Sequence, residues 1–130
     1  MARKLVPSTG PCAPMIRFSR AVRVGNHISI GGTAPIDAHG RTLGVGNAAT
    51  QTRQCLETIN AALEQAGASL NDVVRTRMLP ARIDVWQQIA RVRAEYFKDI
   101  RPLDTVLEVK GFINKECLIE MEVDAVVDED

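Results

Sequence analysis

The chain has 130 residues, of which 45% are hydrophobic and 25% are charged, and these values are typical of one globular domain. Its sixteen basic and sixteen acidic residues cancel, which argues against a nucleic-acid partner bound through clustered lysines and arginines. Three scattered cysteines without metal-ligand spacing, no secretory signal and no membrane-spanning apolar run predict a cytoplasmic protein with reduced thiols and no membrane partner.

The first part of the chain changes pattern near residue 15. Residues 1–14 hold three prolines and little periodicity, so they predict an irregular N-terminal segment of a single domain that covers residues 1–130. Alternating apolar residues then predict a strand over residues 15–24. Arg20 interrupts the apolar face of this strand, where a charged side chain is unusual.

A hairpin is predicted next. Gly25-Asn26 is typical of a two-residue turn, so residues 27–32 should return as a second strand. That strand ends at Gly31-Gly32, a pair that lets another backbone or a ligand approach closely. A turn at residues 37–40 then leads to a short third strand near residues 41–43.

Two helices are predicted in the middle of the chain, with a strand at about residues 73–79 between them. Asn47 can cap the first helix and Gly67 can end it. Asp84 is expected to cap the second helix, which should stop before Pro102. The first helix has one apolar stripe at helical spacing, formed by Cys55, Leu56, Ile59, Ala62, Leu63 and Ala66.

The last strand shows the clearest alternation in the sequence. One of its faces is apolar and comprises Ile119, Met121, Val123 and Ala125. The other face carries three acids, namely Glu120, Glu122 and Asp124. Taken by themselves, these acids predict a solvated face or pairing with arginines on a neighbouring strand.

The order of the predicted elements is β-β-β-α-β-α-β-β, which predicts an α+β fold with a mixed sheet. Two helices can cover only one face of such a sheet. The other face should therefore be covered by something else, and a sheet from another subunit is the expected cover.

Four stretches carry a resemblance to a known family. They read FSRAVRVGNHISIGGTAP, QTRQCLETINAALEQAGASLNDVVRTRML, the RP pair at 101–102, and LIEMEVDAVV near the end. In this order and spacing, over residues 15–127, they resemble the RidA family, also called the YjgF or reactive-intermediate-deaminase family. The resemblance implies a chorismate-mutase-like fold, a homotrimer whose sheets form a central barrel, and a small-molecule metabolite bound in a cleft between subunits.

The resemblance also implies a reaction. Active members hydrolyse enamines or imines, such as 2-aminoacrylate, to a 2-keto acid and ammonia, without a metal or other cofactor. Glu120 matches the family's catalytic carboxylate, a group suited to activating or positioning water. Phe18, Gly31, Asp104 and Thr105 match positions that bind the substrate.

This chain departs from the pattern of active members at several of these positions. Asp104 stands where they carry the arginine that grips the substrate carboxylate, a role that suits the planar guanidinium fork. Phe18 stands where they often carry tyrosine, and Gly31 where they often carry serine. Because Asp104 would repel a carboxylate, we expect weak or altered activity on 2-aminoacrylate-type substrates. Another arginine could enter the cleft instead, and Arg20 and Arg93 are among the candidates.

Two functional classes stay open from the sequence. The first is a divergent deaminase-type hydrolase that uses Glu120, and the second is a trimer that binds a metabolite without catalysis. Some relatives carry a ribonuclease label, and His27 and His39 could serve RNA cleavage, but the neutral charge and the few aromatic residues disfavour it. Cys117 could act as a nucleophile, although a structural thiol is the expected role.

Overall fold

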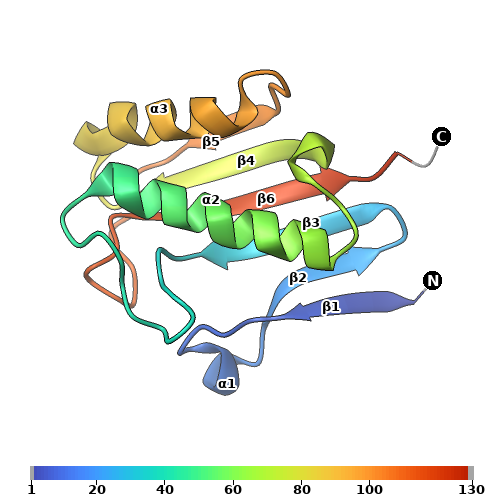
Figure 1. Ribbon diagram of the computed structural model, residues 1–130. Helices are drawn as coiled ribbons and strands as arrows, with labels where there is room; N and C mark the ends of the chain where they lie inside the picture. Colours follow the sequence, from blue (N-terminus) through green and yellow to red (C-terminus); the bar gives the residue numbers. More distant parts are fainter. Residues whose placement is uncertain (1, 129–130) are drawn as a thin grey trace.

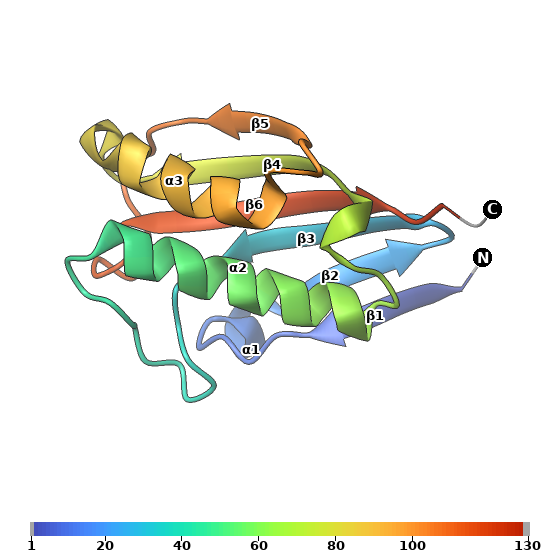
Figure 2. The ribbon, with the colours of Figure 1, turned by 45° about the horizontal axis from the view of Figure 1, so that its top comes forward.

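A six-stranded mixed sheet organises the chain in the computed structural model, which describes residues 2–128. Figure 1 and Figure 2 show the two long helices, α2 and α3, lying on the same face of this sheet. The expected α+β fold with two helices on one face is therefore confirmed. The strands lie in the order β1 (Arg3–Pro7), β2 (Ser19–Val24), β3 (His27–Thr33), β6 (Ile119–Val126), β4 (Val73–Pro80) and β5 (Leu103–Val106).

Neighbouring strands run antiparallel, with one exception. β4 and β5 are parallel because α3 (Trp86–Phe97) crosses between them and returns the chain to the same end of the sheet. The 3₁₀ turn η1 (Leu70–Asp72) leads into β4, and η2 (Ile83–Val85) leads into α3. No helix within residues 2–128 combines the length and the apolar character needed to cross a membrane.

The first long helix, α2 (Ala48–Gln65), begins and ends where its sequence predicts. The side chain of Asn47 caps it by accepting a hydrogen bond from the Thr50 amide at 3.0 Å. Gly67 follows the helix with φ +84°, a conformation that glycine adopts without steric cost. Every residue of the predicted apolar stripe is buried, so the helix packs on the sheet as expected.

The second helix begins differently from the prediction. Asp84 does not cap it, because this residue lies inside the 3₁₀ turn and Val85 occupies the cap position without a side-chain hydrogen bond. The Asp84 carboxylate instead lies 3.3 Å from Nε of Arg82. The helix ends at Phe97, before Pro102, as predicted.

The first third of the chain corrects three predictions. The strand predicted over residues 15–24 begins only at Ser19. Residues 3–7 form the edge strand β1 and residues 13–16 form the short helix α1 (Ala13–Ile16), so the segment is not irregular throughout. The predicted strand near residues 41–43 is only an isolated bridge between Ile36 and Thr42. β1 escapes sequence analysis because only one of its five residues, Val6, is buried, which leaves no alternation to detect.

The face of the sheet opposite the helices is uncovered within this chain. Every second residue of β6, starting at Ile119 and ending at Ala125, faces the helices and is buried. The acids between them, Glu120, Glu122 and Asp124, face the other way and are partly exposed. Val24 and Val126, on neighbouring parts of the open face, are each 42% exposed. The single chain therefore leaves one face of its sheet available to a second layer.

A buried side chain fixes the loop that precedes β6. Gln51 on α2 is fully buried, donates a hydrogen bond to the Glu116 carbonyl at 2.9 Å and accepts one from the Leu118 amide at 2.7 Å. These bonds satisfy two backbone groups that have limited access to water. Gln51 thus fixes the path of the chain just before Glu120.

We expect Gln51→Leu to lower the free energy of unfolding by about 2 kcal/mol or more, because both backbone groups lose their partner. Urea unfolding followed by circular dichroism measures this loss. Gln65→Leu makes the same chemical change at an exposed position of the same helix and should change stability little. Equal effects of the two substitutions would show that the buried bonds do not stabilise the loop.

Candidate functional site

A bulge in β3 shapes the centre of the site. The register between β3 and β6 slips by one residue between Ile30 and Thr33, at the Gly31-Gly32 pair. A Cβ atom at Gly32 would lie 2.8 Å from Oε1 of Glu120, so a side chain at this position would displace the carboxylate from where it lies. A Cβ atom at Gly31 would meet nothing within 4 Å. The bulge therefore presents one glycine to Glu120 and the other to open space.

Glu120 differs from the two acids that share its face of β6. Nη1 of Arg77 on β4 lies 3.5 Å from Oε1 of Glu122 and 3.5 Å from Oδ2 of Asp124. These two acids therefore pair with an arginine of the neighbouring strand, which is one of the two alternatives predicted for them. Glu120 faces Leu79 across the same pair of strands and forms no ion pair with any residue in the part of the chain described. Of the three acids, it alone is left for a ligand or water.

Burial dominates the electrostatics of Glu120. It raises the pKa of this carboxyl above the usual glutamate value, because a partly desolvated carboxylate is less stable than the neutral acid. The charge of Arg20 opposes this rise in pKa, and the charge of Glu122 adds to it. Such a carboxyl is better matched to proton transfer near neutral pH than an exposed glutamate.

Arg20 is a buried cation beside the glycine bulge. The pairing of β1 and β2 shifts register between Val6 and Pro7, and both Arg20 and the next residue, Ala21, are buried. The guanidinium donates hydrogen bonds to the Gly32 carbonyl at 2.9 Å, the Thr33 hydroxyl at 3.2 Å and the Ser8 hydroxyl at 3.0 Å. Burial lowers the pKa of Arg20, while the charge of Glu120 opposes that effect.

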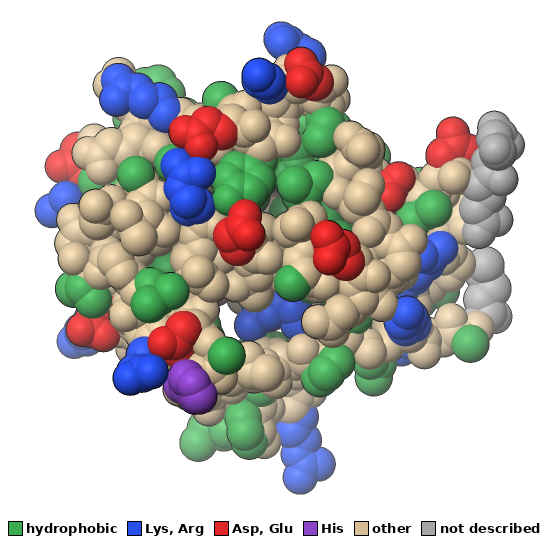
Figure 3. All heavy atoms as spheres, in the orientation of Figure 1, with side chains coloured by type: hydrophobic (Ala, Val, Ile, Leu, Met, Phe, Trp, Pro, Cys, Tyr) green, Lys and Arg blue, Asp and Glu red, His purple; other side chains and the backbone are tan. Residues whose placement is uncertain are grey.

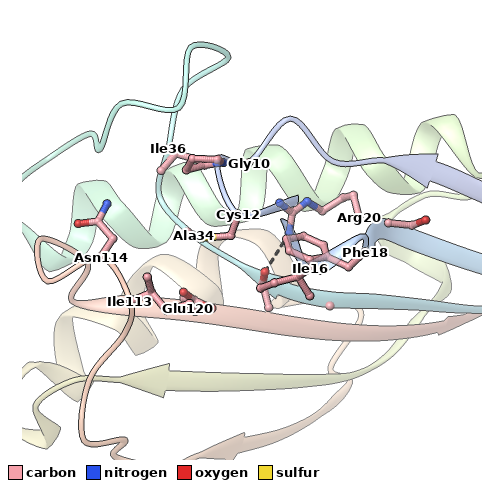
Figure 4. A pocket seen from close by; sticks show the side chains of 14 residues that line it. Gly10, Cys12, Ile16, Phe18, Arg20, Ala34, Ile36, Ile113, Asn114 and Glu120 are labelled. Carbon is pink, nitrogen blue, oxygen red and sulfur yellow. Dashed lines mark hydrogen bonds between the residues drawn. The ribbon is translucent and has the colours of Figure 1, made fainter. Parts of the chain in front are cut away.

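These groups line one cavity of about 570 Å³, a volume typical of sites for small molecules. Figure 4 shows Arg20 reaching this region from β2 and Glu120 from β6. Arg20 is the one cation and Glu120 the one acid among the lining residues. The wall comprises Gly10, Pro11, Cys12, Ile16, Phe18, Ser19, Arg20, Gly31, Gly32, Ala34, Ile36, Ile113, Asn114 and Glu120.

Comparison with known proteins identifies the family. A family profile described as Endoribonuclease L-PSP, which represents the RidA/YjgF proteins, matches residues 10–127. The chain belongs to the RidA/YjgF family. The resemblance seen in the sequence is therefore confirmed.

Relatives match this family member along nearly its whole length. It is 35% identical over 122 residues to a RutC family protein of Pyrococcus abyssi, covering 94% of this chain and 95% of the relative. It is 32% identical over 121 residues to the 3-aminoacrylate deaminase RutC of Acinetobacter baylyi, covering 93% and 95%. The crystal structure of a YjgF/YER057c/UK114 family protein from Mycobacterium tuberculosis is 38% identical, has a TM-score of 0.87, and matches over 97% of this chain and 100% of that one.

Three of the site residues expected from the sequence lie together in this RidA-family structure. Phe18 and Gly31 line the same cavity as Glu120. Phe18 is 37% exposed. The absence of a hydroxyl at position 18 and of a side chain at position 31 leaves the cavity less polar than tyrosine and serine would make it.

The other three expected residues lie apart from this cavity. Asp104 and Thr105 belong to β5, an edge strand separated from β6 by β4, and Arg93 belongs to α3. None of them lines the cavity within one chain. Their expected role in binding a substrate requires a second subunit to bring its β5 to this cavity, and it stays a prediction.

Asp104 is held by a network inside its own chain. Its Oδ1 accepts a hydrogen bond from the Thr76 hydroxyl at 2.6 Å and lies 3.3 Å from Nε of Arg93. Arg93 also donates to the Thr76 hydroxyl at 2.8 Å and to the Pro102 carbonyl at 3.1 Å, and its guanidinium lies over the Phe97 ring. The charge of Asp104 is thus largely balanced by Arg93, which ties β5 to α3.

Sequence analysis missed several residues of the cavity wall. Cys12 and Ile16 enter it because residues 13–16 form a short helix, and Arg17 turns the chain with φ +67°. Ile113 and Asn114 enter from the loop before β6, where Ile113 is 80% exposed. The sequence around these residues has no helical or strand periodicity from which their place could be predicted. Arg20, by contrast, interrupts an apolar strand face, and this departure marked it as a candidate.

Cys117, His27 and His39, the alternative reactive residues considered from the sequence, do not line this cavity. Burial raises the pKa of Cys117 to about 11, with smaller contributions from Glu120 and Glu116, so its thiol stays protonated at neutral pH. No group of three or more potential metal ligands occurs among residues 2–128.

Substituting Arg93→Met should lower the free energy of unfolding by about 1–2 kcal/mol, because Asp104 loses its cation and the Thr76 hydroxyl and Pro102 carbonyl each lose a donor. Urea unfolding measures the change. Arg91→Met, at an exposed position on the same helix, serves as the control and should be nearly neutral. If the two substitutions were equivalent, the Arg93–Asp104 pair would contribute nothing to the attachment of β5.

Proposed function

We propose that this RidA-family chain is a deaminase-type hydrolase that acts on small enamines or imines. The observation that carries the proposal is Glu120, a partly buried carboxyl without an ion pair in the described part of the chain, packed against a glycine bulge in a cavity of small-molecule size. The relative named 3-aminoacrylate deaminase supports the same class of reaction. The proposed chemistry uses residues of the cavity and water.

The proposed reaction needs one water molecule and a proton relay. An enamine first takes up a proton at carbon to give the protonated imine. Glu120 in its carboxylate form then takes a proton from water while the water oxygen bonds to the imine carbon, and the C=N π electrons move to nitrogen to give a neutral carbinolamine. Glu120 returns its proton to the amino nitrogen, the C–N bond breaks as the C=O bond forms, and the hydroxyl proton is released to the departing ammonia or to water. The products are a carbonyl compound and ammonia, and no oxidant or reductant is consumed.

Asp104 should weaken or alter the activity on 2-aminoacrylate-type substrates. In the proposed assembly, β5 of one subunit approaches the cavity of its neighbour, so Asp104 stands near a substrate carboxylate instead of an arginine. Its pairing with Arg93 reduces the repulsion but supplies no free donor for the carboxylate. We therefore expect wild-type turnover of 2-iminopropionate to fall below that of a relative with arginine at the matching position.

A non-enzymatic metabolite-binding trimer is the second candidate. The observation that favours it is the engagement of Arg93 and Asp104 with each other, which leaves the expected anchoring position without a free cation. RNA cleavage, which the family description names, finds less support here. The cavity contains one cation and no histidine, and Figure 3 shows positive and negative side chains interspersed on the face it presents.

Glu120→Gln should reduce imine hydrolysis at least about 100-fold, because the amide cannot accept the proton from water. The imine is generated in the cuvette by an amino-acid oxidase, and release of the keto acid is followed. Glu122→Gln, on the same face of β6 but paired with Arg77, is the matched control and should retain activity within a few-fold. Wild-type activity no greater than that of Glu120→Gln would favour the binding-only candidate.

The stability of Glu120→Gln also reports the free-energy cost of burying the charged Glu120 carboxylate. Its folded pKa is raised, so its contribution to stability is present in acid, below the unfolded pKa, and is lost as the pH rises through the folded pKa. At pH 7 the Glu120→Gln variant, which is neutral at this position, should therefore be at least as stable as the wild type. A lower melting temperature for Glu120→Gln at pH 7 would mean that the carboxylate stabilises the fold.

We also propose that the chain forms a homotrimer whose sheets make a central barrel, with the cavity completed at each subunit boundary. The uncovered face of the sheet supports this, since it carries partly exposed valines beside the Arg77–Glu122–Asp124 network. Sedimentation equilibrium should give three times the mass of the chain over a tenfold dilution. A monomer at all concentrations would contradict both the barrel and the shared cleft.

A further inference from the structure

Arg20 is the one cation on the wall of the cavity that contains Glu120. It comes from β2 of the same chain, whereas the position that should anchor a substrate carboxylate, Asp104, lies on β5 and carries the opposite charge. No direct ion pair joins Arg20 to Glu120 among the residues described, although each affects the pKa of the other. Two opposite charges thus border one cavity without neutralising each other through contact.

The guanidinium of Arg20 retains hydrogen-bonding capacity. Its three hydrogen bonds use only Nη1 and one N–H group of Nη2, out of five N–H groups. No fully buried side-chain nitrogen in residues 2–128 lacks a partner. Nε of Arg20, which has none, must therefore be accessible to water or a ligand. The three bonds also hold the planar group in a fixed orientation, which reduces the entropy lost when it binds an anion.

A second hollow also borders Arg20, between β1 and α2, but Glu120 does not line it. That hollow, of about 400 Å³, is lined by two acids, Asp37 and Glu57, and Arg20 is its sole cation. The cavity with Glu120 has one acid and one cation, so its local charge is balanced. Glu120, the group that the proposed reaction uses, lines only the first cavity, so the anionic group of a substrate is assigned to Arg20 from that side.

The remaining wall of that cavity is mostly apolar. Ile16, Phe18, Ile36 and Ile113 line it, and the polar side chains beside Arg20 and Glu120 are few. A ligand that fits has an anionic group for Arg20, a reacting carbon near Glu120 and an apolar body for the wall. Burying each CH₂ group of such a body contributes about 0.8 kcal/mol in transfer from water, so longer aliphatic side chains should bind more tightly.

We propose that Arg20 binds the substrate carboxylate, and that the preferred substrates are 2-imino or 2-enamino acids with an apolar side chain. This inference rests on the proposed function for the identity of the reacting group. The carboxylate site is thereby supplied by β2 beside the glycine bulge, in place of the β5 position that Asp104 occupies. Ser8 and Thr33, which do not line the cavity, and the Gly32 carbonyl position the guanidinium by accepting its hydrogen bonds.

Binding of stable 2-oxo acids tests this proposal without any turnover. Isothermal titration of the purified full-length protein would compare 4-methyl-2-oxopentanoate, pyruvate and the neutral amide of 4-methyl-2-oxopentanoate. The wild type should bind 4-methyl-2-oxopentanoate at least about tenfold more tightly than pyruvate, and at least about tenfold more tightly than the amide. Equal affinity of the wild type for the acid and its amide would overturn the carboxylate site without reference to any variant.

Arg20→Gln should weaken binding of both acids at least about tenfold and leave binding of the amide unchanged. Arg20→Lys keeps the charge but not the planar fork, and it should retain part of the preference for the acid. Arg23→Gln is the matched control, because Arg23 lies on the same strand and donates to the carbonyls of Gly25 and Ala66 outside the cavity. If Arg20→Gln is folded by circular dichroism but binds the acid and the amide more weakly to the same extent, Arg20 has only a structural role and the carboxylate site is overturned.

The two proposals can fail separately in these experiments. Arg20-dependent binding of 2-oxo acids without Glu120-dependent hydrolysis would retain the carboxylate site and overturn the deaminase. Glu120-dependent hydrolysis whose KM is unchanged in Arg20→Gln would retain the deaminase and overturn the carboxylate site.

Discussion

The close approach of Glu120 to Gly32 is the contact on which the rest of the site depends. The carboxylate occupies space that any side chain at position 32 would fill, and the bulge in β3 brings the glycine backbone to that point. The same bulge directs the Gly32 carbonyl to Arg20, so one local irregularity positions both charges of the cavity. A regular ladder between β3 and β6 would offer neither arrangement, because every residue would then face its partner in simple alternation.

The acids of the sheet differ in what surrounds them rather than in type. Glu122 and Asp124 share Arg77, so their charges are balanced on the sheet surface. Asp104, on the edge strand β5, is paired with Arg93 and accepts a hydrogen bond from Thr76. Glu120 is left without such a partner among the described residues, in a place where desolvation raises its pKa. Structural ion pairs and an unpaired carboxyl thus coexist on one sheet, and the unpaired one faces the cavity.

Much of the fold follows from local sequence signals. The alternation in β6, the stripe and caps of α2, and the Gly25-Asn26 turn each predict their element because tertiary packing reinforces the local preference. The edge strand β1 and the start of α3 were not predictable in this way. β1 buries one side chain, and a 3₁₀ turn displaces the cap expected at Asp84.

Residues of the site could be predicted from the sequence only in two cases: where a residue departed from the apolar pattern of its strand, or where it matched a site position of the RidA family. Glu120, Phe18 and Gly31 followed from the family resemblance, and Arg20 from its place on an apolar strand face. The walls formed by α1 and by the loop before β6 could not be foreseen, because they depend on how distant segments meet. The pairing of Asp104 with Arg93 is likewise a tertiary contact, since it joins a strand to the helix that precedes it.

Gly31 has a consequence for how such a cavity can change in evolution. Its missing side chain points into free volume, whereas that of Gly32 would collide with Glu120. A small side chain introduced at position 31 would therefore enter the ligand space without its Cβ atom meeting the backbone or the carboxylate. The two adjacent glycines thus differ in their tolerance of substitution. At position 32 a side chain would meet the carboxylate, whereas at position 31 a small side chain would change the size of the cavity.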